Sequence, residues 1–304
     1  VRNDLVYQLD DNHDIETGVV GYRVKSKSEY DYQQLPNPNE PGSVTVNVSQ
    51  RINIPIILGG AYIQDRWKIN DEFTLNAGLR LSSARIDSYS WRHLIQPRIS
   101  LEYQYSSDTK FKTYYGDYSQ QRFLTNETFN SNLDLVSVIS DTGQEKAKHI
   151  GGGVEHYLSD NWLFKVEGFY KDYFDLAIDT GTYPEEIYTN DGIGKSAGVE
   201  VLLQKLNNND YEGWLTYTYS KTVRKDSEGW FTPDYDLTHM INFYIDYTVG
   251  KKAHLITTVK YNTGGLYTPI LSATENPETG ALVYDRAPRN SARFPNYFRV
   301  DLWY

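Results

Sequence analysis

The chain has 304 residues, a formal net charge of -10 and no cysteine. The acidic charge argues against a nucleic-acid partner, because affinity for the phosphate backbone comes from clustered Lys and Arg. The lack of cysteine excludes disulfides and thiolate metal sites, and no run approaches the about 18 apolar residues that a membrane-spanning helix needs. Aromatic residues are nevertheless abundant, with 27 Tyr, 6 Trp and 11 Phe.

The earliest clear alternation lies at residues 57–81, on both sides of a short turn at 69–71. From Ile57 to Ile63 every second residue is apolar or small. After the turn an apolar side chain stands at every second position from Phe73 to Leu81, with polar or small residues between. This spacing predicts a hairpin whose strands have one apolar face and one face in water.

Later segments repeat the pattern, at 98–105, 162–171, 215–220 and 241–248. Within 162–171, Phe164 and Val166 alternate with Lys165 and Glu167. The last run, NYFRVDLWY at 296–304, has the composition of a further strand. Counting all such runs gives about 13 strands, many of about ten residues, whereas strands of soluble sandwiches hold about 5 or 6.

Short and long connections take turns along the chain. The short ones are rich in Asn, Asp, Ser and Gly, as tight hairpins require. They lie at 10–13, 69–71, 106–109, 159–161, 207–210 and 250–252. The others, most of them far longer, lie at 32–46, 88–94, 123–145, 183–192, 225–236 and 267–295. An antiparallel meander then has short turns at one end and long loops at the other, as outer-membrane barrels do.

Aromatic residues recur beside the short turns, among them Trp67, Phe73, Tyr103, Trp162 and Trp214. Their position predicts an aromatic girdle at a membrane interface. A sheet in hydrocarbon must close on itself, because unpaired backbone groups cost several kcal/mol each. Single-chain bacterial barrels normally have an even number of strands. The sequence therefore predicts an all-β, antiparallel transmembrane barrel of which this chain is a part.

Several segments carry a family resemblance. AYIQDRWKINDEFTLNAGLRL at 61–81 resembles TonB-dependent outer-membrane receptors, in which Tyr, Gln-Asp and Trp precede a turn and a Thr-Leu…Gly-Leu-Arg strand. SAGVEVLLQK at 196–205, GWLTYTYSKT at 213–222 and RFPNYFRVDLWY at 293–304 also match, in the order of the family. The strand after Gly-Leu-Arg departs from the family at Leu81 and Ser82, where an aromatic and an acidic residue are usual.

The resemblance implies that residues 1–304 are the middle to late portion of one barrel domain of about 22 strands, with short periplasmic turns and long extracellular loops. We expect the plug domain and the final strands to lie outside this chain. The location implied is the bacterial outer membrane, and the function is active uptake of a scarce siderophore, cobalamin, glycan or peptide into the periplasm. The implied partners are outer-membrane lipid, the plug, the TonB energy-coupling complex and the ligand, and a surface lipoprotein cap is left open.

Two sets of residues are expected to act in that function. Large rings and basic residues at the long-loop end are expected to contact the ligand, because rings gain contact area at low entropy cost. This set is Trp91, Arg92, His93, Trp230, Phe231, Tyr235, Tyr267 and Tyr284. The second set, expected to face the lumen and the plug, is Arg66, Arg80, Arg98, Glu102, Lys165, Glu167 and Arg299. The alternatives are interface anchoring for a Trp and cross-strand pairing for the charges.

No pattern predicts an enzyme, a metal centre or a cofactor. The six His lack the close spacing of a zinc site. The acidic pair Asp234 and Asp236 is expected to be solvated, since nothing fixes the spacing of about 5 to 10 Å that a glycosidase dyad needs. Two other functions stay open: a passive porin or autotransporter-type barrel with no plug, and a soluble β-rich glycan-binding domain whose apolar faces pack together.

Overall fold

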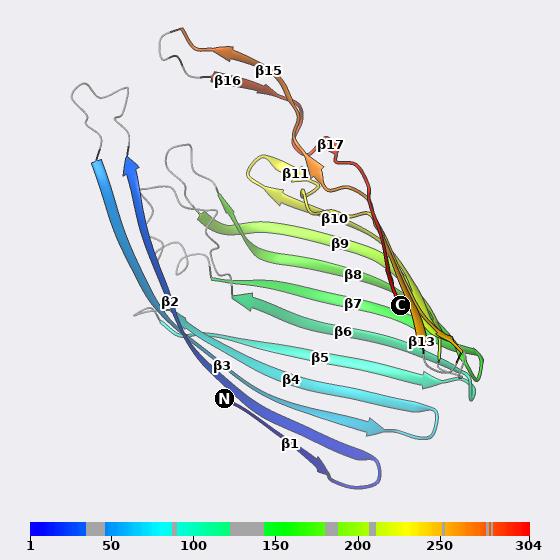
Figure 1. Ribbon diagram of the computed structural model, residues 1–304. Helices are drawn as coiled ribbons and strands as arrows, with labels where there is room; N and C mark the ends of the chain where they lie inside the picture. Colours follow the sequence, from blue (N-terminus) through cyan, green and yellow to red (C-terminus); the bar gives the residue numbers. More distant parts are fainter. Residues whose placement is uncertain are drawn as a thin grey trace.

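One large antiparallel sheet makes up most of the protein. The computed structural model describes residues 1–34, 46–86, 90–121, 143–179, 188–206, 211–250, 253–277, 280 and 282–304. These residues contain no α-helix, and hence no helical segment able to cross a membrane. The sheet curves into an open half-cylinder (Figure 1).

The sheet has 14 strands, and all but β11 follow one another in an antiparallel row. The row is β1 (Arg2–Gln8), β2 (His13–Gln34), β3 (Val46–Lys68), β4 (Phe73–Ile86), β5 (Arg92–Gln104), β6 (Thr109–Gln121), β7 (Gln144–Ser159), β8 (Trp162–Asp179), β9 (Tyr188–Lys205), β10 (Tyr211–Asp226), β12 (His239–Val249), β13 (Ala253–Asn262) and β18 (Tyr297–Trp303). This meander confirms the predicted all-β antiparallel fold and its count of about 13 strands.

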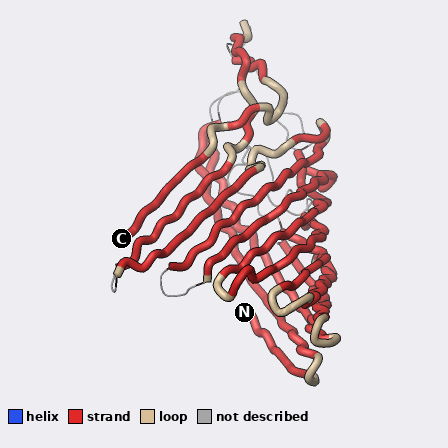
Figure 2. Tube along the Cα trace, turned by 90° about the vertical axis from the view of Figure 1, so that its right-hand side faces the viewer, coloured by secondary structure: helices blue, strands red, loops and turns tan. Residues whose placement is uncertain are grey.

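Short strands occupy two of the predicted long loops. Strand β11 (Gly229–Phe231) pairs with the end of β10, β14 (Leu266–Tyr267) pairs with β17 (Ala292–Arg293), and β15 (Ile270–Glu275) pairs with β16 (Leu282–Arg286). The β15–β16 hairpin projects away from the sheet in both views (Figures 1 and 2). The connections 225–236 and 267–295 are therefore partly ordered by their own strand pairs.

The short connections are tight turns held by side-chain oxygens. Asp10 Oδ1 accepts hydrogen bonds of 2.8 and 2.9 Å from the backbone N–H groups two and three residues later. Asn70 Oδ1 accepts the corresponding bonds at 2.9 and 2.7 Å. Such turns explain the predicted preference for Asp and Asn. Figure 2 shows them together at one end of the sheet, the turn end; the opposite end is the loop end. The predicted turn at 207–210 lies outside the described residues.

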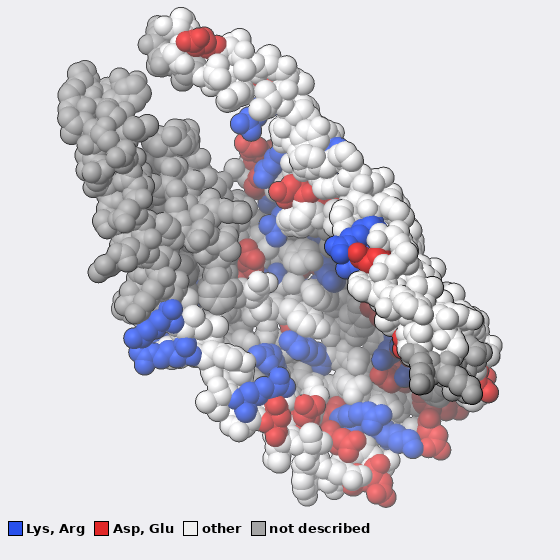
Figure 3. Space-filling view, in the orientation of Figure 1, with Lys and Arg blue, Asp and Glu red and all other residues white. Residues whose placement is uncertain are grey.

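The pairing register sorts the side chains into two faces. Leu79 lies opposite Ile63 on the neighbouring strand, whereas Arg80 lies opposite Tyr62. Ile63, Leu79 and Ile150 each expose 53% of their surface although they are apolar. Charged side chains gather inside the half-cylinder (Figure 3). The convex, outward face is thus apolar and the hollow face polar, which is the reverse of a soluble sandwich.

Aromatic rings of the hollow face lie over glycines of the neighbouring strand. The directly opposed pairs are Tyr62 with Gly18, Tyr114 with Gly151 and Phe169 with Gly198. A Cβ atom added to Gly151 would lie 2.5 Å from the Tyr114 hydroxyl oxygen. Only glycine leaves room for the ring to lie against the sheet in this way.

Most of the predicted aromatic girdle lies on the outward face. Phe73 stacks on Tyr103 there, with ring centres 4.6 Å apart. Trp214 is an exception, because it stacks on Tyr244 at 6.0 Å on the hollow face. Its neighbour Leu215 takes the outward position, and successive residues of a strand point to opposite faces.

Candidate functional site

Cations and aromatic rings meet on the hollow face, near the loop end of strands β5 to β10. Two adjacent rows of the sheet carry them. In one row Arg98 and His149 both lie opposite Gly116, and His149 lies opposite Lys171. In the next row Tyr118 and Tyr173 flank β7, and Arg224 follows on β10. We call Arg98, Tyr118, His149, Lys171, Tyr173 and Arg224 the upper cluster.

A stack of three side chains forms one side of the upper cluster. The guanidinium carbon of Arg98 lies 4.5 Å from the centre of the Tyr118 ring. The Tyr118 ring in turn stacks on the His149 ring, with 4.3 Å between the centres. The stack holds the arginine against the wall through the ring face, which attracts a cation.

The other cations of the upper cluster also lie over rings. Arg224 lies 5.4 Å from the centre of the Tyr235 ring, and the Lys171 ammonium lies 4.6 Å from that of Phe169. Within the described part of the chain, none of Arg98, Lys171 and Arg224 forms an ion pair with a carboxylate. In the described part of the chain these three cations are thus held by ring faces and not by ion pairs.

A cavity of about 290 Å³ lies among these side chains. Its lining includes Tyr118, Tyr173 and Arg224, together with a single acidic residue, Glu145. Glu145 Oε1 accepts a hydrogen bond of 3.3 Å from the backbone N–H of Ala177. Walls of this kind suit an anion that also presents flat or apolar surface to the aromatic rings.

A second group of charges lies nearer the turn end of the hollow face. Lys165 Nζ lies 3.0 Å from Glu155 Oε1, and Lys112 and Lys110 lie 3.2 and 3.6 Å from Glu102. These side chains come from β5, β6, β7 and β8 and face one another across the strands. We call Glu102, Lys110, Lys112, Glu155 and Lys165 the lower network. Its charges largely neutralise one another.

An ion pair between the partly exposed Arg293 and the buried Asp236 joins the two long connections beside the upper cluster. Arg293 Nη2 donates to Asp236 Oδ2 at 2.8 Å, and Arg293 Nη1 donates to the carbonyl oxygens of Asp236 and Gly264 at 2.7 and 2.9 Å. Asp236 is only 4% exposed, and its Oδ1 accepts the backbone N–H of Thr222 at 2.9 Å. Asp236 is thus a structural residue and not the solvated acid expected from the sequence.

Further contacts tie the same connections together. Asn290 donates to the carbonyl oxygen of Thr232 at 2.8 Å. Arg289 lies 3.5 Å from the centre of the Phe231 ring and is ion-paired with Asp226. We call the described residues of the joined connections, 226–238, 263–277, 280 and 282–296, the ledge. The ledge fixes the segment that carries Phe231 beside the upper cluster, since Phe231 lies opposite Arg224.

Comparison with known families assigns the chain. A family model described as TonB dependent receptor-like, beta-barrel matches residues 1–302. The chain belongs to the TonB-dependent receptor family. It is therefore part of a β-barrel of the bacterial outer membrane, with the turn end on the periplasmic side and the loop end outside the cell.

Solved TonB-dependent receptors share the fold at low sequence identity. The closed form of the ferric-catecholate import receptor Fiu from Escherichia coli K12 is 15% identical with a TM-score of 0.68, covering 99% of this chain and 47% of the other. The Pseudomonas aeruginosa ferripyoverdine receptor bound to ferripyoverdine is 14% identical with a TM-score of 0.63, and the match covers 99% of this chain and 41% of that protein. The copper transporter OprC is 12% identical with a TM-score of 0.65, and the match covers 99% of this chain and 46% of that protein. This chain thus spans less than half the length of these proteins. No curated protein matches the sequence.

The charges predicted to face the lumen of the receptor all lie on the hollow face: Arg66, Arg80, Arg98, Glu102, Lys165, Glu167 and Arg299. Most are paired within the wall. Arg66 lies 3.6 Å from Asp14, and Glu167 accepts a 2.8 Å hydrogen bond from Tyr114. Cross-strand pairing thus explains most of the set, whereas Arg98 belongs to the upper cluster. Contact with a plug stays a prediction.

The predicted ligand-contact set is divided between the faces. Arg92 and His93 lie in β5 and not in a loop, because the hairpin ladder with β4 extends to them. His93 shares the outward face with Ser83, to which it is hydrogen-bonded at 2.8 Å, and Trp91 stacks on His93 at 6.1 Å. The alternation leaves Arg92 on the hollow face.

The rest of that set lies at the loop end. Trp230 is outward and within 5.9 Å of the Lys195 ammonium. Tyr267 stacks on Phe294 at 4.5 Å, and Tyr284 lies on the projecting β15–β16 hairpin. Phe231 and Tyr235 are the predicted residues that reach the upper cluster, through Arg224.

Sequence reasoning missed most of the upper cluster. Tyr118, His149 and Tyr173 stand on the polar side of their strands, but His149 follows Tyr118 by 31 residues and Tyr173 follows His149 by 24 residues. The sequence did carry one signal. Each of these residues lies an even number of positions from a charged residue of its own strand, which places both on the same face. The described residues hold no group of three His, Cys, Asp or Glu side chains that could bind a metal ion.

Proposed function

We propose that this chain forms the lumen wall of a TonB-dependent active transporter, which binds an anionic ligand at the upper cluster and imports it into the periplasm. The single observation that carries the proposal is the set of three cations at the loop end of the hollow face. They lie over aromatic rings and form no ion pair with a described carboxylate, although Glu145 lines the same cavity as Arg224. The set lies near the loop end, from which a ligand would enter the barrel (Figure 1).

The ligand class we propose is a metal chelate with net negative charge and flat or apolar groups. Arg98 and Arg224 would meet the charge, and Tyr118, Tyr173 and Tyr235 would meet the flat surface. A neutral glycan would gain nothing from three cations. The similar receptors of solved structure are described as a ferric-catecholate receptor, a receptor bound to ferripyoverdine and a copper transporter, which agrees with a metal-bearing ligand.

In the same proposal the lower network holds a plug domain. Its side chains line the hollow face below the upper cluster and offer both signs of charge to a polar partner. The free edges of β1 and β18 would pair with the remaining strands of the barrel, because an open edge in hydrocarbon leaves N–H and C=O groups without partners.

Uptake of radioactive iron by whole cells tests the proposal. Cells that express the complete receptor are supplied with anionic ferric chelates, in the presence and absence of TonB. We expect uptake that requires TonB and that falls when Arg98 and Arg224 are both replaced by Gln. Uptake that continues without TonB would indicate a passive channel. Binding of neutral sugars with no effect of the two substitutions would refute the ligand class.

A further inference from the structure

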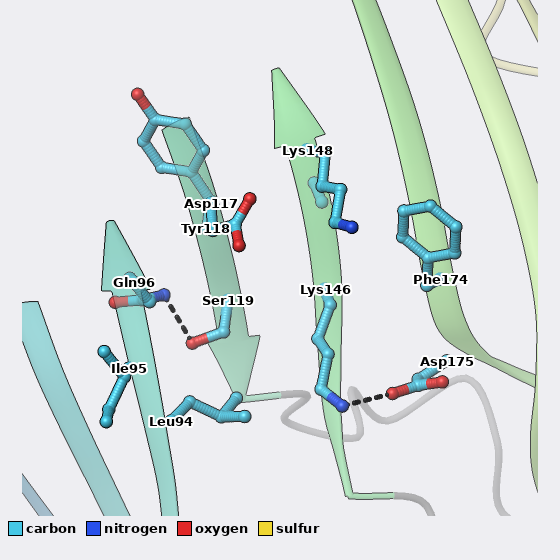
Figure 4. A pocket seen from close by; sticks show the side chains of 11 residues that line it. Leu94, Ile95, Gln96, Asp117, Tyr118, Ser119, Lys146, Lys148, Phe174 and Asp175 are labelled. Atoms are coloured by element: carbon cyan, nitrogen blue, oxygen red, sulfur yellow. Dashed lines mark hydrogen bonds and ion pairs between the residues drawn. The ribbon is translucent and has the colours of Figure 1, made fainter. Parts of the chain in front are cut away.

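A bulge interrupts β8 beside the cavity of the upper cluster. The pairing with β9 shifts register between Tyr173 and Leu176, and again between Leu176 and Ile178. Asp175 has a φ of 54°, in the left-handed region that residues other than glycine seldom adopt. Lys146 on β7 holds Asp175 there through an ion pair of 2.7 Å (Figure 4). Bulges of this kind often re-aim groups beside functional sites.

The bulge leaves one backbone N–H group free to bind a side chain. Ala177 falls between the shifted pairs and has no ladder partner on β9 within the described part of the chain. Its N–H group donates a hydrogen bond of 3.3 Å to Glu145 Oε1 on β7. Gly192 on β9 makes room for the bulge, because a Cβ atom there would lie 2.6 Å from the carbonyl oxygen of Leu176. Strands β7, β8 and β9 together fix the position of one carboxylate.

The carboxylate held by the bulge lies in the cavity of the upper cluster. Glu145 lies opposite Gln120 in the sheet, at a position that the alternation assigns to the hollow face. It lines the same cavity of about 290 Å³ as Tyr173 and Arg224. Among the described residues Glu145 has no ion-pair partner, and Arg224 lies over the Tyr235 ring instead. One cavity thus presents a carboxylate and a guanidinium that are not paired with each other.

A ligand that fills this cavity has to satisfy both charges. It displaces water from the Glu145 carboxylate, and a charged acceptor that loses water without gaining a donor weakens binding. A wholly anionic ligand would also place like charges side by side. A protonated amine beside the anionic groups would donate to Glu145 and leave the negative charge to Arg224. The glutamates of the lower network have no such requirement, because lysines already pair with them.

The geometry points to Glu145 as a specificity-determining residue that accepts a hydrogen bond from a protonated amine of the ligand. The substrate class is then a zwitterionic metal chelate, with net negative charge and one basic group. This inference rests on the proposed function, because it adds a second requirement for the same ligand in the same cavity. A site built around a fixed polar group rejects analogues that lack the matching partner.

Titration of the complete, purified receptor with two matched ferric chelates tests the inference. One is an anionic ferric tricatecholate with a pendant ammonium group, and the other is the same chelate with a methyl group in place of the ammonium. We expect the receptor to bind the ammonium form about tenfold more tightly, as a hydrogen bond between charged groups provides.

Substitution of Glu145 should move the two affinities in opposite directions. Glu145→Gln should weaken binding of the ammonium form about tenfold, because the charged acceptor is lost. It should tighten binding of the methyl form about threefold, because a like charge is removed from beside the anion. A merely structural role would not produce such a crossing. Glu155→Gln, on the same strand and face but in the lower network, is the matched control and should leave the preference unchanged.

Three outcomes would overturn the inference and leave the proposed function standing. They are equal affinity of the unsubstituted receptor for the two chelates, a preference that survives Glu145→Gln, and equal weakening of both chelates by that substitution. Failure of the unsubstituted receptor to bind either chelate would overturn the proposed function and the inference together. The gel shift on heating of a folded barrel checks that each variant is assembled, and the preference of the unsubstituted receptor needs no variant.

Discussion

The upper cluster and the lower network are built from the same kinds of residue on the same face, but they use their cations differently. In the lower network Lys110, Lys112 and Lys165 all lie within ion-pair distance of a glutamate. In the upper cluster Arg98 and Arg224 lie over tyrosine rings. A ring holds a cation in place without neutralising its charge.

The difference teaches which charges of a polar wall are available for binding. Paired charges stabilise the wall or contact a polar partner, but they leave little net charge to attract an anion. Cations that rest on rings keep a positive potential in a cavity with aromatic walls, which is the setting in which an anion gains most. Charge alone would not have separated the two regions, because both contain lysines or arginines on the hollow face.

The largest effect is expected from breaking the ion pair of the ledge. Arg293→Gln leaves the carboxylate of Asp236 buried without its partner, which costs about 3 to 5 kcal/mol. The ledge should then exchange amide hydrogens faster, and ligand binding at the upper cluster should weaken. The lower network should keep its protection. Arg289→Gln, whose ion pair is more exposed, should have a smaller effect, and equal exchange in both variants would contradict the structural role of Asp236.

The next largest effect tests which side chains lie on the outward face and which on the hollow face, an assignment on which both the upper cluster and the lower network depend. Arg in place of Leu79 or Phe243, both outward, should cost about 2 to 4 kcal/mol near the membrane centre. Arg in place of Asn76 or Asn242 on the hollow face should cost little. Unfolding by urea in lipid vesicles measures both sets, and equal tolerance would show that the faces are reversed.

The difference between the upper cluster and the lower network is tested by neutralising single cations in each. Arg98→Gln or Arg224→Gln should weaken binding of an anionic chelate about 10-fold to 100-fold, as expected for the loss of a hydrogen bond to a charged group. Lys165→Gln in the lower network should leave binding unchanged. Titration of the purified receptor with ferric chelates gives the ratio, and equal losses at the two regions would remove the distinction between them.

A smaller effect is expected where a ring covers a glycine. Gly151→Val would push the ring of Tyr114 away from the wall and weaken its 2.8 Å hydrogen bond to Glu167, at a cost of about 1 to 3 kcal/mol. Gly168→Ala is the control, because a Cβ atom at Gly168 has open space around it. Thermal unfolding compares the two, and a Gly151→Val variant as stable as the control would show that the close approach is unimportant.

The smallest effect is expected within the lower network. Lys165→Gln should cost about 0.2 to 1 kcal/mol of stability, because its pair with Glu155 is partly exposed to water. A double-mutant cycle with Glu155→Gln should recover a coupling of this size that shrinks at high salt. A coupling that does not respond to salt would mean that the network is shielded from water.

Most of the fold could be predicted from sequence because its signals are local. The alternation from Phe73 to Leu81 fixes both faces of a strand, and Asp10 or Asn70 marks a tight turn by a bond to its own backbone. The lumen charges followed from the same alternation. Trp214 was wrongly predicted to join the outward aromatic girdle because it lies near a turn. It is two residues from Thr216 and therefore lies on the same, polar face.

The upper cluster could not be predicted in the same way. Its members come together only through the register of six strands, and no local pattern fixes a register across loops of unequal length. The ledge was hidden for a related reason. Asp236 and Arg293 are 57 residues apart, and nothing near either residue indicates that they pair.

The rings that cover glycines keep the inner wall flat at several positions. Because Tyr62, Tyr114 and Phe169 lie flat across the neighbouring strand, large side chains do not stand out into the bore at these positions. Under the proposed uptake, a ligand moving along the axis would therefore pass flat rings and not protruding side chains at these three positions. Substitutions that raise a ring would then be expected to slow uptake without changing the affinity for the ligand.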